Sequence, residues 1–267
     1  MRRLTGIALL LLGATMLPGG PARAEQPLKQ NNYQTVNNAF RPGERLTYNI
    51  SWSRIVDAGI AVMEVKNGDL VDDHTPTYRL TSTTHSVGLV EAVYPVRDTV
   101  ESIVDAETLA SLAFDLQELH GKHKRRRSMI FDVKQGTVVS QLNNDPPETT
   151  RIPPHVEDAL AALYYMRTRD DYVPGKQMIV DVNDSGKNWA VEIHVMGREK
   201  ITTPAGTFST IKVRTFPKYE GVFMHTGEIY IWVTDDRRKI PVTMKSTISI
   251  GSIVATLTKM EGGSSVQ

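Results

Sequence analysis

Apolar residues alternate with polar ones along much of this chain, and turn signals recur about every 8–12 residues. In residues 46–52 (LTYNISW) every second residue is apolar, and residues 189–195 and 242–250 show a similar alternation. Successive side chains of a strand point to opposite faces, so these segments predict strands with one dry and one wet face. Such strands are typical of antiparallel sheets, and the chain is predicted to be all-β.

Two kinds of segment depart from this pattern. Residues 229–233 and 58–65 are apolar on both faces, so we expect them to lie under a second layer or to line a cavity. Residues 155–168 follow Pro153-Pro154 and carry apolar residues at helical spacing, which predicts one amphipathic helix near mid-chain. A strongly curved sheet, or an unclosed β-barrel wrapped around this helix, accommodates both observations.

The N-terminus has the pattern of a secretion signal. A basic start (Met1-Arg2-Arg3) and an apolar stretch (4–17) lead to Ala22-Arg23-Ala24, which predicts cleavage after Ala24. A membrane anchor is the alternative, but Pro18-Gly19-Gly20-Pro21 cuts the apolar run short. We therefore expect a periplasmic protein with no transmembrane segment in its mature chain. Its expected organisation is a signal (1–24), a flexible leader (25–38), a single β-rich domain (39–260) and a frayed tail (261–267).

Composition excludes several classes of protein. The chain contains no cysteine, so disulfides, thiol catalysis and cysteine-ligated metal centres are absent. Loss of Arg2, Arg3 and Arg23 with the signal leaves 28 basic and 30 acidic residues, so the overall charge does not indicate nucleic-acid binding.

An ordered set of short segments resembles a known family. The set consists of Phe40–Tyr48, Tyr94–Asp98, Val156–Leu160, Leu163–Arg167 and Ile231–Val242. Together they resemble the bacterial envelope family called domain of unknown function 3108, from about residue 40 to residue 260. The resemblance implies an exported, mostly β protein with no catalytic motif to carry over. The closing hairpin is also similar to that of periplasmic lipoprotein carriers, which hold acyl chains inside an open barrel.

A basic cluster is the first candidate binding site. Residues 120–127 (HGKHKRRR) include Lys122, Lys124, Arg125 and Arg126, and a strand would present cations on both faces. The cluster could bind lipid phosphates or another acidic surface. Alternatively, it is an exposed edge strand that its charges keep from aggregating.

Tyr230 and Trp232 form the second candidate site. They could line a cavity for an acyl chain, although aromatic residues at alternating positions more often belong to a plain core. Catalytic motifs are missing: no Gly-x-Ser-x-Gly occurs, Asp235-Asp236 reads as a turn, and the histidines lack metal-ligand spacing. We expect no cofactor and no metal.

These observations favour a non-catalytic binder or carrier of a hydrophobic or lipid-like ligand. The alternative is an envelope assembly or scaffold protein that recruits a protein partner through its sheet edges. An enzyme acting on envelope polymers is the third and weakest hypothesis.

Overall fold

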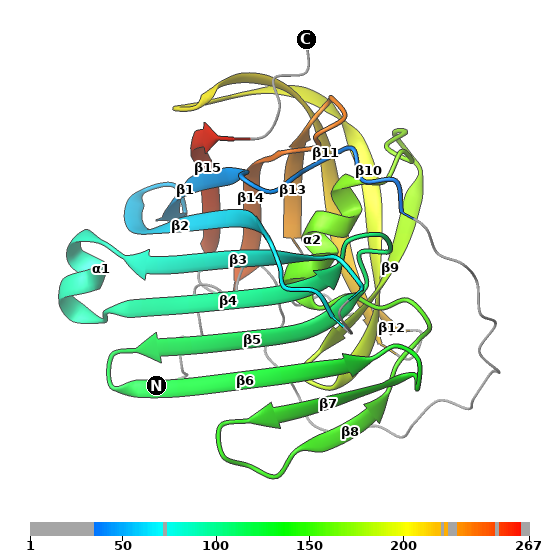
Figure 1. Ribbon diagram of the computed structural model, residues 1–267. Helices are drawn as coiled ribbons and strands as arrows, with labels where there is room; N and C mark the ends of the chain where they lie inside the picture. Colours follow the sequence, from blue (N-terminus) through cyan, green and yellow to red (C-terminus); the bar gives the residue numbers. More distant parts are fainter. Residues whose placement is uncertain (1–34, 72–73, 220–221, 224–228, 249–250, 263–267) are drawn as a thin grey trace.

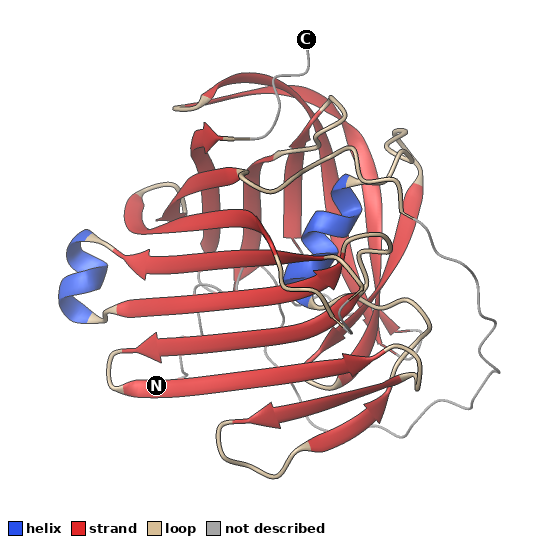
Figure 2. Cartoon of the chain, viewed as in Figure 1, coloured by secondary structure: helices blue, strands red, loops and turns tan. Residues whose placement is uncertain are grey.

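The computed structural model describes residues 35–71, 74–219, 222–223, 229–248 and 251–262. The expected signal segment and most of the leader lie outside the described residues. Within them the chain is mostly strand, with two short helices (Figure 2). The elements are α1 (Gly88–Val93), α2 (Ala159–Arg167), β1 (Arg45–Trp52), β2 (Val56–Asn67), β3 (Thr77–Ser86), β4 (Val96–Asp105), β5 (Ser111–His120), β6 (His123–Asp132), β7 (Thr137–Leu142), β8 (Glu148–Arg151), β9 (Gln177–Asp184), β10 (Lys187–Thr203), β11 (Gly206–Tyr219), β12 (Val222–Phe223), β13 (Ile229–Thr234), β14 (Pro241–Ile248) and β15 (Gly251–Glu261).

The strands form one continuous, strongly curved sheet (Figure 1). Its order is β8-β7-β6-β5-β4-β3-β2-β1-β15-β14-β13-β11-β10-β9, and β12 pairs with β11 off this path. Neighbouring strands are antiparallel, and β1 pairs with β15, so the two ends of the described chain meet in the middle of the sheet. The predicted all-β, unclosed antiparallel architecture is confirmed.

The residues that follow the edge strand β8 reach the other edge strand, β9, and Glu157 forms an isolated bridge with it. The backbone N–H of Glu157 donates to the Asp181 carbonyl at 3.0 Å, and the Asn183 N–H donates to the Glu157 carbonyl at 2.8 Å. The predicted helix over 155–168 is therefore wrong at its start. Because Glu157 is held in an extended pairing with β9, α2 begins only at Ala159.

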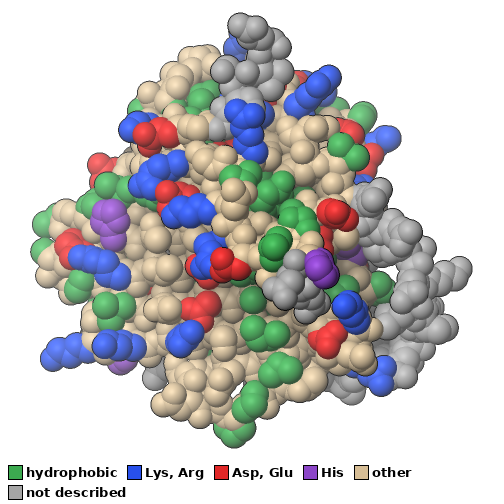
Figure 3. Space-filling view, viewed as in Figure 1, with side chains coloured by type: hydrophobic (Ala, Val, Ile, Leu, Met, Phe, Trp, Pro, Cys, Tyr) green, Lys and Arg blue, Asp and Glu red, His purple; other side chains and the backbone are tan. Residues whose placement is uncertain are grey.

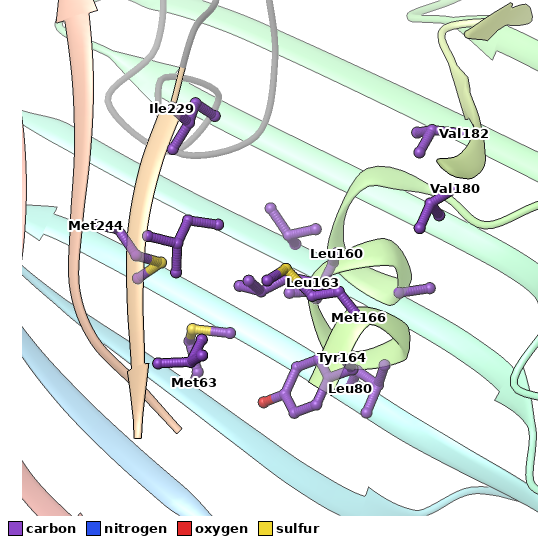
Figure 4. Close-up of a cluster of buried hydrophobic side chains, with 14 of the residues drawn as sticks. Met63, Leu80, Leu160, Leu163, Tyr164, Met166, Val180, Val182, Ile229 and Met244 are labelled. Carbon is purple, nitrogen blue, oxygen red and sulfur yellow. The ribbon is translucent and has the colours of Figure 1, made fainter. Parts of the chain in front are cut away.

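The helix α2 occupies the concave side of the sheet. Six of its nine residues are buried, among them Leu160 and Tyr164 at 0% and 1% exposure. Figure 4 shows these side chains among Met63, Leu80 and Met244, which belong to the inward faces of the strands. The space inside the curve is thus filled by α2 and by the apolar residues that alternate along the strands.

Asp158 fixes the start of α2. Its Oδ1 accepts hydrogen bonds from the N–H groups of Leu160 and Ala161, both at 2.9 Å, which is the geometry of an N-cap. Its Oδ2 accepts from Ser102 Oγ at 2.5 Å and from Ser111 Oγ at 2.7 Å. Burial raises the pKa of Asp158, and these four donors counteract the effect of burial.

A buried ion pair fixes the end of α2. The Arg167 guanidinium makes two parallel contacts with the Glu44 carboxylate, at 2.7 and 2.8 Å. The same guanidinium donates to the carbonyls of Arg238 and Ala39, at 3.1 and 3.2 Å. Arg167 and Glu44 are only 1% and 3% exposed, so the pair ties the helix to the start of β1 and to the β13–β14 connection within the core.

Candidate functional site: the α1 rim

Three connections lie together at one end of the sheet. Because β1 to β6 form an antiparallel meander, the β1–β2, β3–β4 and β5–β6 connections share one rim, and the β2–β3, β4–β5 and β6–β7 connections share the opposite rim. We call the first of these the α1 rim and define it by Ile55, Leu89, Val93, Lys122 and Lys124. At the left of Figure 1, α1 and the β5–β6 hairpin lie along this rim.

The α1 rim carries the most exposed large apolar side chains of the described residues. Ile55, Leu89 and Val93 are 84%, 78% and 82% exposed. Figure 3 shows apolar side chains at the left margin over α1, with basic side chains below them. Exposed large apolar side chains are unfavourable in water, and several of them on one rim commonly mark a surface that binds a partner or a membrane.

The helix α1 presents Leu89 and Val93 to solvent, although Val90 packs against the core and other tertiary contacts hold the helix in place. Leu89 and Val93 are four residues apart and therefore share a face, and no residue of α1 is buried. Glu91 anchors the helix through its contacts with Arg97 at 2.6 and 2.8 Å and with Ser86. The exposure of Leu89 and Val93 is thus built into a fixed connection.

The basic cluster divides between the two faces of β6, as strand alternation predicts. Arg125 points to the concave side and lies 3.2 Å from Glu118, while Arg126 points outward and lies 2.8 Å from Asp115. Lys122 and Lys124 are exposed at the hairpin. Within the described residues, neither lysine has an acidic group within 4.0 Å, so the two charges at the rim are available to a partner.

Tyr230 and Trp232 lie elsewhere. Ile231 and Val233 point into the core, so strand alternation places Tyr230 and Trp232 on the convex face. There Lys212 Nζ lies 5.1 Å and 4.9 Å from the centres of the two rings, and Trp232 Nε1 donates to Glu199 at 2.6 Å. The predicted binding residues therefore occupy two separate places, and the structure does not bring them together.

A buried polar pair lies just behind the α1 rim. His120 Nε2 is 2.8 Å from Asp98 Oδ1, and both residues are buried on the concave face. The hydrogen bond to Asp98 raises the pKa of His120, and burial opposes this effect. Asp98 lies directly across the strands from Glu118, which in turn pairs with Arg125. The cluster joins the β5–β6 hairpin to β4.

This pair makes stability depend on pH. Since the pKa of His120 is raised in the folded chain, its contribution is complete below the unfolded value of about 6.5 and is lost as pH rises through the folded value. We expect the free energy of unfolding in urea to fall as pH rises above about 6.5. His120→Gln should reduce this slope, and an unchanged slope would contradict the assignment.

His155 also makes stability fall as pH rises, because its pKa is raised in the folded chain. Burial lowers its pKa, but its contacts with Glu157 and with the Thr108 carbonyl outweigh burial and raise it. The slope should therefore shrink in the His120→Gln variant without vanishing. A His155→Gln variant should reduce the slope by a further part.

The apolar half of the α1 rim was missed at the level of sequence, although a signal for it exists. Residues 89–93 (LVEAV) form a short, mainly apolar stretch between Gly88 and Pro95. A segment this short between two strands is a connection, and apolar residues in a connection tend to be exposed.

Comparison with known proteins agrees with this architecture. The family described as protein of unknown function (DUF3108) matches residues 47–258, which is most of the chain. The chain belongs to this family. No curated protein matches it.

One solved structure has the same kind of fold. A β-barrel-like DUF1849 protein from Brucella abortus has a TM-score of 0.54 and 12% identity, over 82% of this chain and 97% of that one. A protein with a YmcC-like fold from Bacteroides fragilis has a TM-score of 0.32 and 12% identity, over 86% of this chain and 100% of that one. At such identities, the first likeness concerns the fold alone. The described residues of this DUF3108 protein contain no helix long and apolar enough to cross a membrane.

Proposed function

We propose that this DUF3108 protein is a non-catalytic binder of lipid surfaces in the bacterial envelope, and that it binds them through the α1 rim. One observation carries the proposal. The three most exposed large apolar side chains of the described residues share a rim with two lysines that have no acidic neighbour there. Apolar side chains that enter the acyl boundary, flanked by cations at the phosphates, are the usual composition of an interfacial membrane site.

The free energies expected from the apolar side chains and the lysines of the α1 rim are sufficient for reversible binding to a membrane. Full burial of a Val, Leu or Ile side chain contributes roughly 1.5–3 kcal/mol, and a lysine near an anionic surface contributes about 1 kcal/mol. Three apolar residues and two lysines would offset the loss of freedom on binding without making the attachment permanent.

The filled interior supports the rim as the place of binding. Because α2 and the core occupy the concave side, an acyl chain enclosed there would have to displace packed side chains such as Leu160 and Tyr164. The alternative, recruitment of a protein through the sheet edges, has less support. One edge, β8, is four residues long, and the other, β9, is already bridged by Glu157.

The proposed location rests on the N-terminal pattern, which lies outside the described residues. Export with cleavage after Ala24 gives a mature chain that begins at Glu25. An intact mass of the exported protein tests this, and retention of residues 1–24 would contradict it.

Co-sedimentation with vesicles tests the binding. The mature protein should sediment with vesicles that contain about one third phosphatidylglycerol, and less with pure phosphatidylcholine. Leu89→Gln with Val93→Gln should reduce binding to both. Lys122→Gln with Lys124→Gln should abolish the preference for the anionic vesicles, and added salt should have the same effect.

Matched controls come from the opposite rim. Leu70, in the β2–β3 connection, is 59% exposed, and Lys134 lies in the β6–β7 connection. Leu70→Gln and Lys134→Gln should leave binding unchanged. Absence of sedimentation, or equal losses at both rims, would refute the proposal.

A further inference from the structure

A polar groove lies on the convex side of the sheet, away from α2. The long hairpin of β10 and β11 arches over β15 and β1 at the top of Figure 1. Beneath its outer end, the hairpin and the convex faces of β1, β2, β14 and β15 enclose a groove of about 670 Å³. This volume lies within the range of small-molecule sites, about 300–1,000 Å³.

Hydroxyl groups dominate the lining of this groove. Five threonines line it, three of which are Thr243 on β14, Thr256 on β15 and Thr202 on the hairpin. A hydroxyl both donates and accepts hydrogen bonds, so the walls match a ligand that itself carries many hydroxyls. Tyr48 offers no free ring face, since it is 1% exposed and its hydroxyl donates to the Pro241 carbonyl at 2.9 Å.

The charges of the groove are mainly positive. Arg54 comes from the β1–β2 turn and Lys200 from the hairpin, so the two cations lie on different walls. In the part of the chain that the structure describes, neither has an acidic group within 4.0 Å. The lining contains one carboxylate, that of Asp57, and its Oδ1 accepts a hydrogen bond from Asn49 Nδ2 at 2.7 Å. The two cations therefore outnumber the one anion in the groove.

We propose that this groove binds an anionic saccharide, either a uronate or a sugar phosphate. Sugar hydroxyls would pair with the threonines, and the anionic group would lie between Arg54 and Lys200. Two of the lining hydroxyls have partners within the chain, since Thr202 Oγ1 lies 3.0 Å from Thr207 Oγ1 and Thr258 Oγ1 donates to the Thr47 carbonyl at 3.0 Å, but each can still accept a hydrogen bond. An acyl chain would offer no hydrogen bond to this polar lining, and a nucleobase would find no ring to stack on. The groove adjoins the α1 rim at the β1–β2 connection, but its lining includes none of the five residues that define the rim. The inference does not depend on lipid binding there.

Calorimetric titration of the mature protein tests the inference. The anionic probes are digalacturonic acid and galactose 1-phosphate, and their neutral counterparts are galactobiose and galactose. At least one anionic probe should bind with a Kd below about 1 mM, and at least tenfold more tightly than its counterpart. Absence of binding by both anionic probes, or equal binding of anionic and neutral sugars, would overturn the inference.

Variants assign the binding to the groove. Arg54→Gln with Lys200→Gln should lower the affinity for the anionic probe at least tenfold. The same change should alter any affinity for the neutral counterpart by less than twofold. Thr256→Val keeps the side-chain shape, removes one hydroxyl and should weaken binding about threefold or more. Thr149→Val on β8 is the matched control and should have no effect, and melting temperatures verify that each variant is folded. Anionic binding that survives both groove variants would place the site elsewhere and refute the inference.

Discussion

Replacing Arg167 with methionine should lower the free energy of unfolding by about 3–5 kcal/mol, as loss of one partner from a buried ion pair does. The change leaves the Glu44 carboxylate buried without its cation. It also leaves the carbonyls of Ala39 and Arg238 without a donor from this side chain. Urea denaturation measures the loss directly.

A double variant separates the ion pair from the packing around it. Replacement of both Glu44 and Arg167 by apolar residues (Glu44→Leu with Arg167→Met) should cost less than Arg167→Met alone, because no isolated charge stays buried. A loss below about 1 kcal/mol in the single variant would mean that the pair does not hold α2 in the concavity.

Replacing Leu160 with aspartate should cost roughly 3 kcal/mol or more. Leu160 is fully buried at the centre of the core, so the change removes apolar packing and buries a carboxylate without a partner. Ala162→Asp on the same helix is the matched control, and it should cost less because Ala162 is only partly buried. Equal and small shifts in melting temperature for both variants would contradict the packing of α2 inside the sheet.

The sequence pattern predicted most of the sheet because its physical cause is local. Residues 46–52 and 189–195 alternate, and they form β1 and part of β10. The start of the helix could not be predicted in the same way. Residues before Ala159 have a composition suited to a first helical turn, but the pairing of Glu157 with Asp181 and Asn183 is a tertiary contact that local sequence does not encode.

The binding residues were harder to predict for a related reason. Residues 229–233 are all apolar, so their sequence does not show which face of the strand turns inward. In the structure Ile231 rather than Trp232 belongs to the core. The α1 rim unites Ile55, Leu89 and Lys122 only through the strand order of the meander. The arch of the β10–β11 hairpin over β1 has no evident signal in the sequence.

Lipid binding at the α1 rim can be tested most directly with a single environment-sensitive label. The chain has no cysteine, so Leu89→Cys and Leu70→Cys each give one attachment site, at the α1 rim and the opposite rim. On addition of anionic vesicles, a nitrobenzoxadiazole label at position 89 should shift its emission to the blue and be quenched by lipids that carry a quencher in the acyl region. The label at position 70 should show neither change. An unchanged label at position 89, or equal changes at both positions, would contradict binding of the membrane by the α1 rim.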